Sequence, residues 1–190
     1  MFHKARQKGE SVKGWKYTNS TSAIKQSPIH FTLNNKDYIL HITHDDRTKL
    51  LARNGSDRTI FKTTKSFTTP ISISKNGTLY AVTSENKLWT GKANGEIEII
   101  ELPRLNTNSK ILSYNNGYYI SNENSISYIN SKRNEESNIK LDSPVQEISY
   151  KEGYIAITTN TSLYLIANNK IIDGFPIDSD GQFNISDIDN

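Results

Sequence analysis

A tyrosine-led apolar triplet recurs four times along the chain. The copies are Tyr38-Ile39-Leu40, Tyr80-Ala81-Val82, Tyr119-Ile120-Ser121 and Tyr154-Ile155-Ala156. They stand 42, 39 and 35 residues apart. Self-similarity at a period of roughly 20–50 residues is typical of repeat architectures, in which each unit buries its apolar face against its neighbours. The chain is therefore expected to fold as an array of similar units.

Each triplet opens the same order of elements. A polar turn and a second strand follow, with the second strands centred on Leu50-Leu51, Leu88-Trp89, Ile126-Ser127-Tyr128 and Leu163-Tyr164-Leu165. A second turn comes next, at Asn54-Gly55, Asn94-Gly95, Lys132 to Asn134 and Asn168-Asn169. Third strands are expected at Ile60-Phe61, Ile97 to Ile100, Ile139 to Leu141 and Ile171-Ile172. A proline then marks each exit, at Pro70, Pro103, Pro144 and Pro176, where a lost N–H is tolerated.

This order, at about 40 residues per unit, is the period of a β-propeller blade. A β-sandwich is the main rival, but sandwiches do not repeat one four-part order. Composition agrees, since 24 Ile and 17 Thr against 7 Ala favour strands over helices. The predicted fold class is all-β, a propeller-like array of about four antiparallel sheets that forms part of a longer propeller.

The repeats divide a single domain, 1–190, at approximate boundaries. They are 31–70, 71–113, 114–150 and 151–190, preceded by a partial repeat over 1–30. Gly14-Trp15-Lys16-Tyr17 matches Gly174-Phe175-Pro176-Ile177, and Met1-Phe2 falls where Leu163-Tyr164 falls in the last unit. These matches favour an arc cut from a longer ring, with a fragment or gene-model start at Met1. A five-sheet ring with one blade supplied from both ends is the alternative.

Aromatic residues are expected between the sheets. One aromatic per repeat closes the second strand in three of the units, and we predict that these three, Trp89, Tyr128 and Tyr164, occupy equivalent buried positions. Tyr118 and Tyr119 are likewise interpreted as interior packing rather than as a binding surface.

The glycine and aromatic before an exit strand (Gly14-Trp15-Lys16-Tyr17, Gly174-Phe175-Pro176), with the tyrosine-led strands and Asn-Gly hairpins, resembles the propeller-like region of large Bacteroidetes cell-envelope proteins. Leu79-Tyr80-Ala81-Val82 with Leu88-Trp89 also resembles one repeat of the PQQ-like propellers, a class that includes quinoprotein dehydrogenases and outer-membrane assembly lipoproteins. The resemblance implies a propeller fold and a periplasmic or cell-envelope location. It carries over no catalytic residue.

Two clusters contain metal-ligand side chains, and both are interpreted as turns. His41, His44, Asp45 and Asp46 do not converge on one strand face, because residues three apart on a strand point to opposite sides. Asp178, Asp180 and Asn184 lack the distal bidentate Glu of a calcium loop. The five glycosylation sequons, at Asn19, Asn54, Asn76, Asn160 and Asn184, equal about the number expected by chance. The sequence therefore assigns no catalytic, cofactor-binding or metal residue and no cofactor.

Charge and hydropathy exclude two classes of partner. The net charge is only +3 and no Arg-rich stripe occurs, so nucleic acid is not expected. No apolar run is long enough for membrane insertion. Without cysteine, the redox compartment stays open. The leading hypothesis is a non-enzymatic interaction or scaffold module of a bacterial envelope protein, with a protein or glycan partner and self-association of its terminal blades. The alternatives are a propeller enzyme, quinoprotein-like or glycan-active, and a structural spacer.

Overall fold

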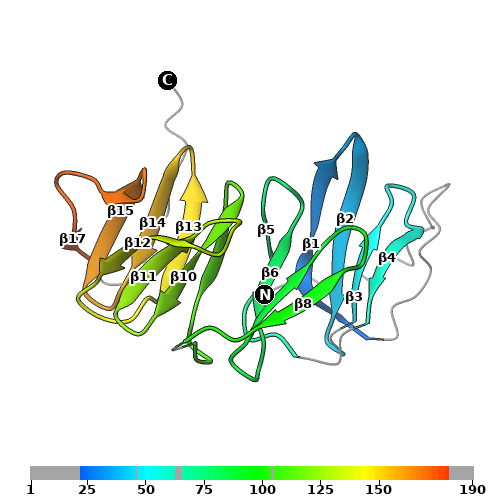
Figure 1. Ribbon diagram of the computed structural model, residues 1–190, viewed down its shortest axis with the longest axis horizontal. Helices are drawn as coiled ribbons and strands as arrows, with labels where there is room; N and C mark the ends of the chain where they lie inside the picture. The colour runs from blue at the N-terminus through cyan, green and yellow to red at the C-terminus, as the bar shows by residue number, and fades with distance from the viewer. Residues whose placement is uncertain (1–21, 46, 63–65, 104, 180–190) are drawn as a thin grey trace, which may run out of the picture. The chain divides into compact units, whose positions relative to one another are not determined.

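The structure, a computed structural model, describes residues 22–45, 47–62, 66–103 and 105–179. The regular elements among these residues are all β-strands, and none of the described residues is helical. The strands form four antiparallel sheets (Figure 1), here named sheets I to IV in chain order. The predicted all-β fold class is confirmed.

Four strands pair in chain order within each sheet. Sheet I contains β1 (Ile24–Leu33), β2 (Lys36–Thr43), β3 (Thr48–Leu51) and β4 (Asp57–Phe61). Sheet II contains β5 (Ser72–Ile73), β6 (Leu79–Val82), β7 (Leu88–Gly91) and β8 (Ile97–Ile100). Sheet III contains β9 (Ile111–Tyr114), β10 (Gly117–Asn122), β11 (Ser125–Ile129) and β12 (Glu135–Lys140). Sheet IV contains β13 (Glu147–Lys151), β14 (Tyr154–Thr158), β15 (Ser162–Ala167) and β16 (Lys170–Ile171), and β17 (Ile177–Asp178) also pairs with β15.

The three strands expected in each repeat are present. The triplets lie on β2, β6, β10 and β14, and the second and third strands follow in order. Each sheet also begins with a strand that no triplet marks: β1, β5, β9 or β13. Strand β1 starts at Ile24, so sheet I takes in residues that the sequence groups with the partial repeat 1–30. The matching segments Met1-Phe2 and Gly14 to Tyr17 lie outside the described residues.

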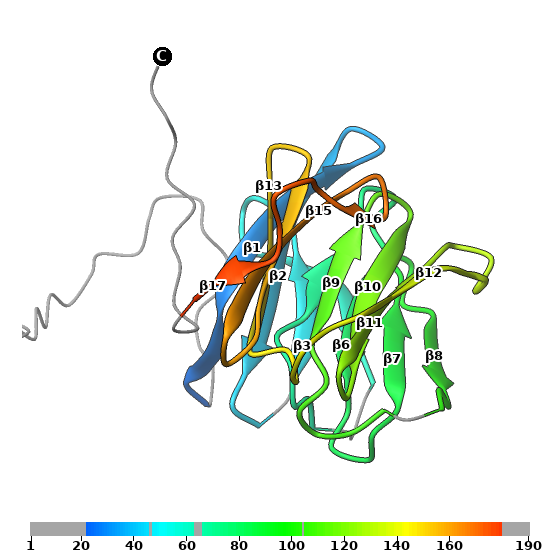
Figure 2. The ribbon, with the colours of Figure 1, turned by 90° about the vertical axis from the view of Figure 1, so that its left-hand side faces the viewer.

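The prolines mark links between sheets at three of the four expected places. Pro70, Pro103 and Pro144 each stand between the last strand of one sheet and the first strand of the next. Pro176 differs, because the strand after it, β17, returns to the same sheet and lies beside β15 (Figure 2). Ile177 there pairs with Leu163, and Asp178 pairs with Ser162.

The chain divides into two compact units, Met1–Thr63 and Thr64–Asn190. The first unit holds sheet I, whose register pairs Leu40 with Leu50 and Ile42 with Thr48. These four side chains are buried and lie on one face of the sheet, because facing residues of paired strands share a side.

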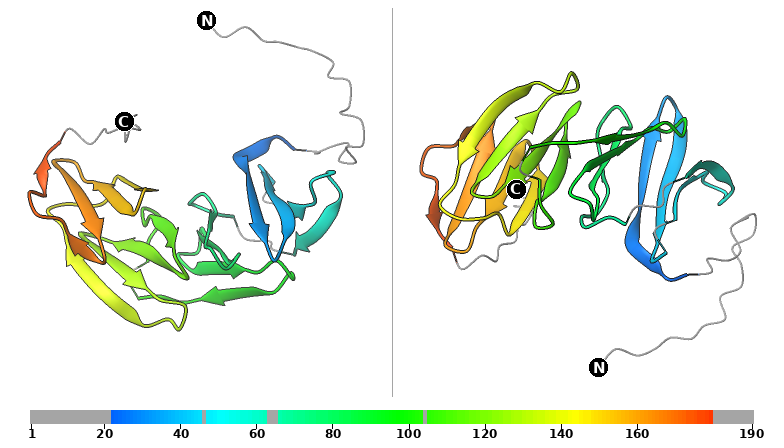
Figure 3. Two further views of the ribbon diagram at one scale, coloured as in Figure 1. Left: turned by 90° about the horizontal axis from the view of Figure 1, so that it is seen from above. Right: turned by 60° about the horizontal axis from the view of Figure 1, so that its bottom comes forward.

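The second unit holds sheets II, III and IV, which follow one another (Figure 3). Strand β9 adjoins β5 and β6 on one side and β13 on the other, so it connects the three sheets. One apolar core lies between sheets II and III: Tyr80, Val82, Leu88, Leu105, Ile111, Tyr118 and Ile120. A second core lies between sheets III and IV: Tyr119, Ile126, Tyr128, Leu141, Val145, Ile155, Ile157, Tyr164 and Ile166.

The predicted equivalence of Trp89, Tyr128 and Tyr164 is wrong, although all three are buried. Tyr128 points toward the following sheet and Tyr164 toward the preceding one, so both join the core between sheets III and IV. Trp89 packs against Phe67, with the two ring centroids 5.1 Å apart. It lies on the face of the strand opposite to its neighbour Leu88, which joins the core between sheets II and III. Tyr128 therefore lies on the face toward the following sheet, whereas Trp89 and Tyr164 lie on the opposite face of their own sheets, because a shift of one residue along a strand moves a side chain to the other face.

The expected Asn-Gly turns share one geometry. In the turn of Asn54-Gly55, Ala52 N–H donates to Ser56 O at 2.8 Å and Gly55 N–H donates to Ala52 O at 2.8 Å. The same pair of bonds recurs in four further turns, so five residues occupy its fourth position with positive φ. They are Gly55, Gly77, Asn86, Gly95 and Arg133. This pattern is a type I turn followed by a bulge residue in the left-handed region, where glycine fits without strain.

Candidate functional site: two cavities of the second unit

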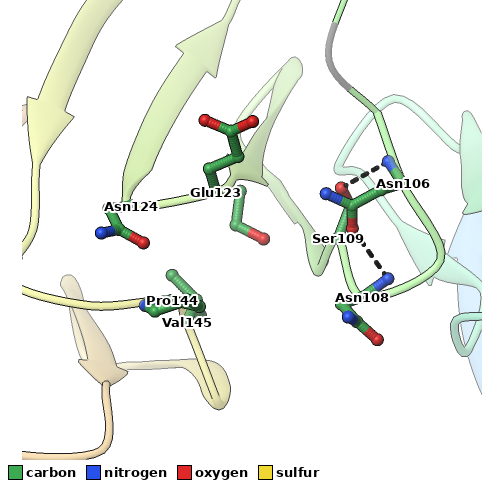
Figure 4. Close-up of a pocket in the computed structure, with 8 residues that line it drawn as sticks. Asn106, Asn108, Ser109, Glu123, Asn124, Pro144 and Val145 are labelled. Carbon is green, nitrogen blue, oxygen red and sulfur yellow. Dashed lines mark hydrogen bonds between the residues drawn. The ribbon is translucent and has the colours of Figure 1, made fainter.

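Three successive loops of the second unit surround a cavity of about 420 Å³, here named the Asn106 cavity. Asn106, Asn108 and Ser109 come from the β8–β9 link, Ser121, Glu123 and Asn124 from the end of β10 and its turn, and Pro144 and Val145 from the β12–β13 link. Figure 4 shows the first group facing the other two. The cavity is therefore built at one end of sheet III by its neighbours on both sides.

Hydrogen bonds hold the first wall of this cavity. The N–H of Asn108 donates to Asn106 Oδ1 at 2.9 Å, and the N–H of Asn106 donates to Ser109 Oγ at 3.2 Å. Lys110 N–H donates to Ser121 Oγ at 2.7 Å, while Ser121 N–H donates to Lys110 O at 3.0 Å. Short polar side chains form such local bonds in preference to regular structure. The wall is thus preformed by its own sequence.

Asp142 holds the wall that contains Pro144 and Val145. Its carboxylate accepts hydrogen bonds from Thr161 Oγ1 at 2.9 Å and from Ser162 Oγ, and its N–H donates to Tyr164 Oη at 3.1 Å. Burial acts to raise the pKa of Asp142, but the hydroxyl bonds, led by Ser162, lower it to about 2. The ionised carboxylate therefore ties the β12–β13 link to the β14–β15 turn.

The Asn106 cavity offers mainly neutral hydrogen-bonding groups. Among the described residues that line it, Glu123 is the one ionisable side chain. Asn108, Glu123 and Asn124 are exposed, and each asparagine amide presents both a donor and an acceptor. A catalytic nucleophile is usually paired with a base within hydrogen-bond reach. The described lining thus offers neutral hydrogen-bonding groups and a single carboxylate.

A second cavity, of about 200 Å³, lies at the opposite end of sheet III, on the side of sheet II; it is here named the Arg133 cavity. Its lining includes the rings of Tyr80 and Tyr118, which are both buried with centroids 4.8 Å apart. Burial, followed by the nearby Tyr80, raises the pKa of Tyr118 to about 12. These tyrosines therefore stay neutral and supply an aromatic wall.

Charged side chains line the same cavity. Lys92 pairs with Glu96 at 2.6 Å, and Arg133 pairs across the sheets with Glu98. Lys92, Glu98 and Arg133 belong to the lining. Each of these pairs is about half exposed or more, so solvent screens it and its net stabilisation is about 0–1 kcal/mol.

Arg133 occupies a backbone position that suits glycine. Its φ is +67°, and the corresponding position holds glycine in the turns of Gly55, Gly77 and Gly95. A side chain in the left-handed region costs about 1 kcal/mol or more. The stabilisation from the exposed ion pair with Glu98 is no larger than this backbone cost. Stability alone therefore does not explain an arginine at this position.

The described residues of the histidine and aspartate clusters are divided between strands and a turn. His41 is buried on β2, and burial, followed by the charge of Lys49, lowers its pKa. His44 is exposed beyond the strand end, and Asp45 pairs with Arg47 at 3.0 Å. Asp46, Asp180 and Asn184 lie outside the described residues, and Asp178 lies on β17. Across the part of the chain that the structure describes, no group of three or more such side chains is placed to hold a metal ion.

The tyrosines singled out in the sequence pack inside the second unit, although Tyr118 also lines the Arg133 cavity. Sequence reasoning missed both cavities. Many of their residues are common turn types, and the one local signal is Arg133 at a position that holds glycine in three of the four related turns. The described residues contain no helix long and apolar enough to cross a membrane.

The sequence matches no protein-family model and no curated protein. Its structure is similar to the carboxyl-terminal WD40 domain of Sif2, with a TM-score of 0.55 at 10% identity, covering 73% of this chain and 45% of that one. It is also similar to BBS1N in complex with ARL6DN (TM-score 0.59, 8% identity, 85% and 58% covered). The dihydro-heme d1 dehydrogenase NirN in complex with DHE gives a TM-score of 0.60 at 9% identity, with 84% and 38% covered.

This chain spans about half the length of the structures it matches, with shares of 48%, 58% and 51% for three of them. The identities are too low to indicate a shared function, and the resemblance to Bacteroidetes envelope proteins is not confirmed by these matches. WD40 domains are β-propellers built from four-stranded sheets. What the likenesses establish is the fold, and the chain has the antiparallel sheets of a β-propeller.

Proposed function

We propose that the chain is a non-enzymatic interaction module of a bacterial envelope protein, and that its Asn106 cavity binds an extended segment of a partner protein. The observation that carries the proposal is the convergence of three loops on one neutral, hydrogen-bonding cavity. Loops presented by a rigid sheet scaffold are frequent binding surfaces. The envelope setting follows from the sequence resemblance.

The chemistry of the lining favours a peptide. Asparagine amides carry the same donor and acceptor pair as a peptide group, so Asn108 and Asn124 can pair with the backbone of an extended chain. Pro144 and Val145 add an apolar patch, and Glu123 favours a Lys or Arg in the bound segment. A glycan is less favoured, because the described lining residues include no aromatic ring for a sugar to pack against.

An enzyme has less support. NirN, one structure of the same fold, is a dehydrogenase. Glu123, however, has no second ionisable group beside it among the described lining residues, whereas glycoside hydrolysis ordinarily uses a pair of carboxylates.

The test selects peptides on the whole chain from a random displayed library and measures binding of the synthetic peptides by calorimetry. We expect basic, extended peptides that bind Asn108→Ala and Glu123→Gln at least about tenfold more weakly than the unmodified protein. Asn160→Ala, an exposed asparagine in the β14–β15 turn, is the matched control and should leave binding unchanged. Peptides that bind both cavity variants as tightly as the unmodified protein would contradict the proposal. A glycan found on an array whose binding neither variant weakens would also contradict it.

Self-association is a second interaction proposed for the chain. Leu163 and Leu165 are half-buried on β15, on the face opposite to Tyr164 and Ile166, which join the core with sheet III. Apolar residues left partly exposed on a sheet face favour contact with another copy of the chain. We expect light scattering to show association that rises with concentration and is reduced by Leu165→Lys. A stable monomer at high concentration would contradict it.

A further inference from the structure

The Arg133 cavity combines an aromatic wall with charges of both signs. Tyr80 and Tyr118 form the wall. Two cations, Lys92 and Arg133, and one anion, Glu98, belong to the same lining. Such a lining complements a molecule that carries an apolar group together with a carboxylate and an ammonium group.

Arg133 can bind a ligand while it keeps its ion pair with Glu98. Its guanidinium carries five N–H donors, and the bond to Glu98 is donated by Nη2. The remaining donors can hold a carboxylate in the bidentate manner typical of arginine. Glu98, in turn, can accept from an ammonium group of the same ligand. Since Arg133 and Glu98 are in contact, the two charged groups of the ligand must also lie close together.

The size of the cavity narrows the ligand further. Its volume of about 200 Å³ is below the roughly 300–1,000 Å³ of pockets for drug-sized ligands. A carboxylate and an ammonium group on one carbon, with one apolar side chain, satisfy the volume, the charges and the aromatic wall together.

We propose that the Arg133 cavity binds a free α-amino acid with an apolar side chain. The carboxylate pairs with Arg133, with Lys92 nearby, the ammonium group pairs with Glu98, and the side chain packs against Tyr80 and Tyr118. This site is separate from the proposed peptide site, because the Asn106 cavity lies at the other end of sheet III.

The experiment titrates the whole chain with L-phenylalanine, and calorimetry and NMR of the tyrosine rings monitor the binding. Saturable binding is expected, with shifts at the tyrosine rings of the cavity. Phenylalaninamide, which lacks the carboxylate, and N-acetylphenylalanine, which lacks the ammonium group, should each bind at least about tenfold more weakly, because a hydrogen bond to a charged group is lost.

Two variants that place glycine at equivalent left-handed turn positions test the role of Arg133 in binding. Arg133→Gly should weaken binding at least about tenfold while the protein stays folded, because glycine suits the turn. Asn86→Gly makes the same backbone change in the β6–β7 turn and should leave binding unchanged. In Glu98→Gln, N-acetylphenylalanine and phenylalanine should bind alike.

Three results would overturn the proposal. The first is no saturable binding of L-phenylalanine, L-leucine or L-tryptophan. The second is equal affinity of Arg133→Gly and the unmodified protein. The third is binding of the tripeptide Gly-Gly-Phe as tightly as phenylalanine, which would assign the cavity to the carboxyl terminus of a polypeptide instead.

Discussion

The two interfaces of the second unit use the same repeat in different ways. Between sheets III and IV, four tyrosine rings form a cluster with neighbouring centroids 5.1 to 6.0 Å apart: Tyr114 contacts Tyr119, Tyr128 and Tyr150, and Tyr119 also contacts Tyr128. Between sheets II and III, two tyrosines meet and the interface opens into the Arg133 cavity. The number of aromatic side chains therefore distinguishes an interface filled by rings from one that leaves room for a ligand.

Polar contacts join the sheets at both interfaces. Tyr119 Oη donates to Asn169 Oδ1 at 2.5 Å and joins sheet III to sheet IV. Sheets II and III are joined by Ser72 Oγ and Ser113 Oγ at 2.7 Å and by the exposed pair of Arg133 and Glu98. Because its core contains more packed tyrosine rings, the first interface is expected to contribute more to stability, and the second, which contains the Arg133 cavity, more to binding.

Removing the most deeply buried ring of the tyrosine cluster, Tyr119, should have the largest effect. Tyr119→Ala is expected to lower the free energy of unfolding by about 3–5 kcal/mol, because it leaves a cavity in a buried core. Tyr118→Ala should cost less, since its ring has one tyrosine neighbour and borders an existing cavity. Tyr119→Phe, the control, loses only the bond to Asn169, worth about 1 kcal/mol. Urea unfolding measures all three, and equal losses for Tyr118→Ala and Tyr119→Ala would remove the distinction between the interfaces.

Adding a side chain at Gly117 in sheet III should have the second-largest effect on stability. A Cβ on Gly117 would lie 2.2 Å from the carbonyl oxygen of Ile129 and 3.0 Å from the hydroxyl of Tyr128. Because the backbone carbonyl cannot move away easily, Gly117→Ala should destabilise the unit by about 1–3 kcal/mol. Thermal unfolding and the NMR signals of Tyr128 provide the measurement, and an unchanged melting temperature would show that β10 and β11 can separate locally.

Acid should weaken the wall held by Asp142. Its pKa is lowered from 3.8 to about 2 in the folded chain, so its contribution to stability is present above pH 3.8 and is lost as the pH falls through about 2. The group is exposed, so we expect a loss smaller than that of Gly117→Ala. Asp142→Asn should flatten the stability profile between these pH values. A profile identical to that of the unmodified protein would contradict the role of this carboxylate.

The smallest effect on stability is expected at the more open interface. Arg133→Gly relieves a strained backbone and loses an exposed ion pair, so the free energy of unfolding should stay level or rise by up to about 1 kcal/mol. Denaturant titration at low and high salt checks this, since only the lost pair depends on salt. A clear destabilisation would mean that Arg133 is structural, and would weaken the case for a ligand at its cavity.

Local features of the sequence predict much of the fold. The strands containing Tyr80-Ala81-Val82 and Leu163-Tyr164-Leu165 are read from short apolar segments, and the turn at Asn94-Gly95 from its residue types. These signals act over a few residues, through side-chain alternation and through the backbone freedom of Asn and Gly. Strand β5 escapes the same reasoning, because it has only two residues, Ser72 and Ile73, and exists through its pairing with β6.

The sequence by itself determined the all-β repeat and the positions of most strands and turns. Only the tertiary structure decided which face each aromatic takes, since Tyr128 and Tyr164 meet in one core while Trp89 packs elsewhere. It also decided the two cavities, because Arg133 and Glu98 are 35 residues apart in sequence. Periodicity specifies that a side chain alternates, but the neighbour it meets depends on how whole sheets pack, and that is a long-range property.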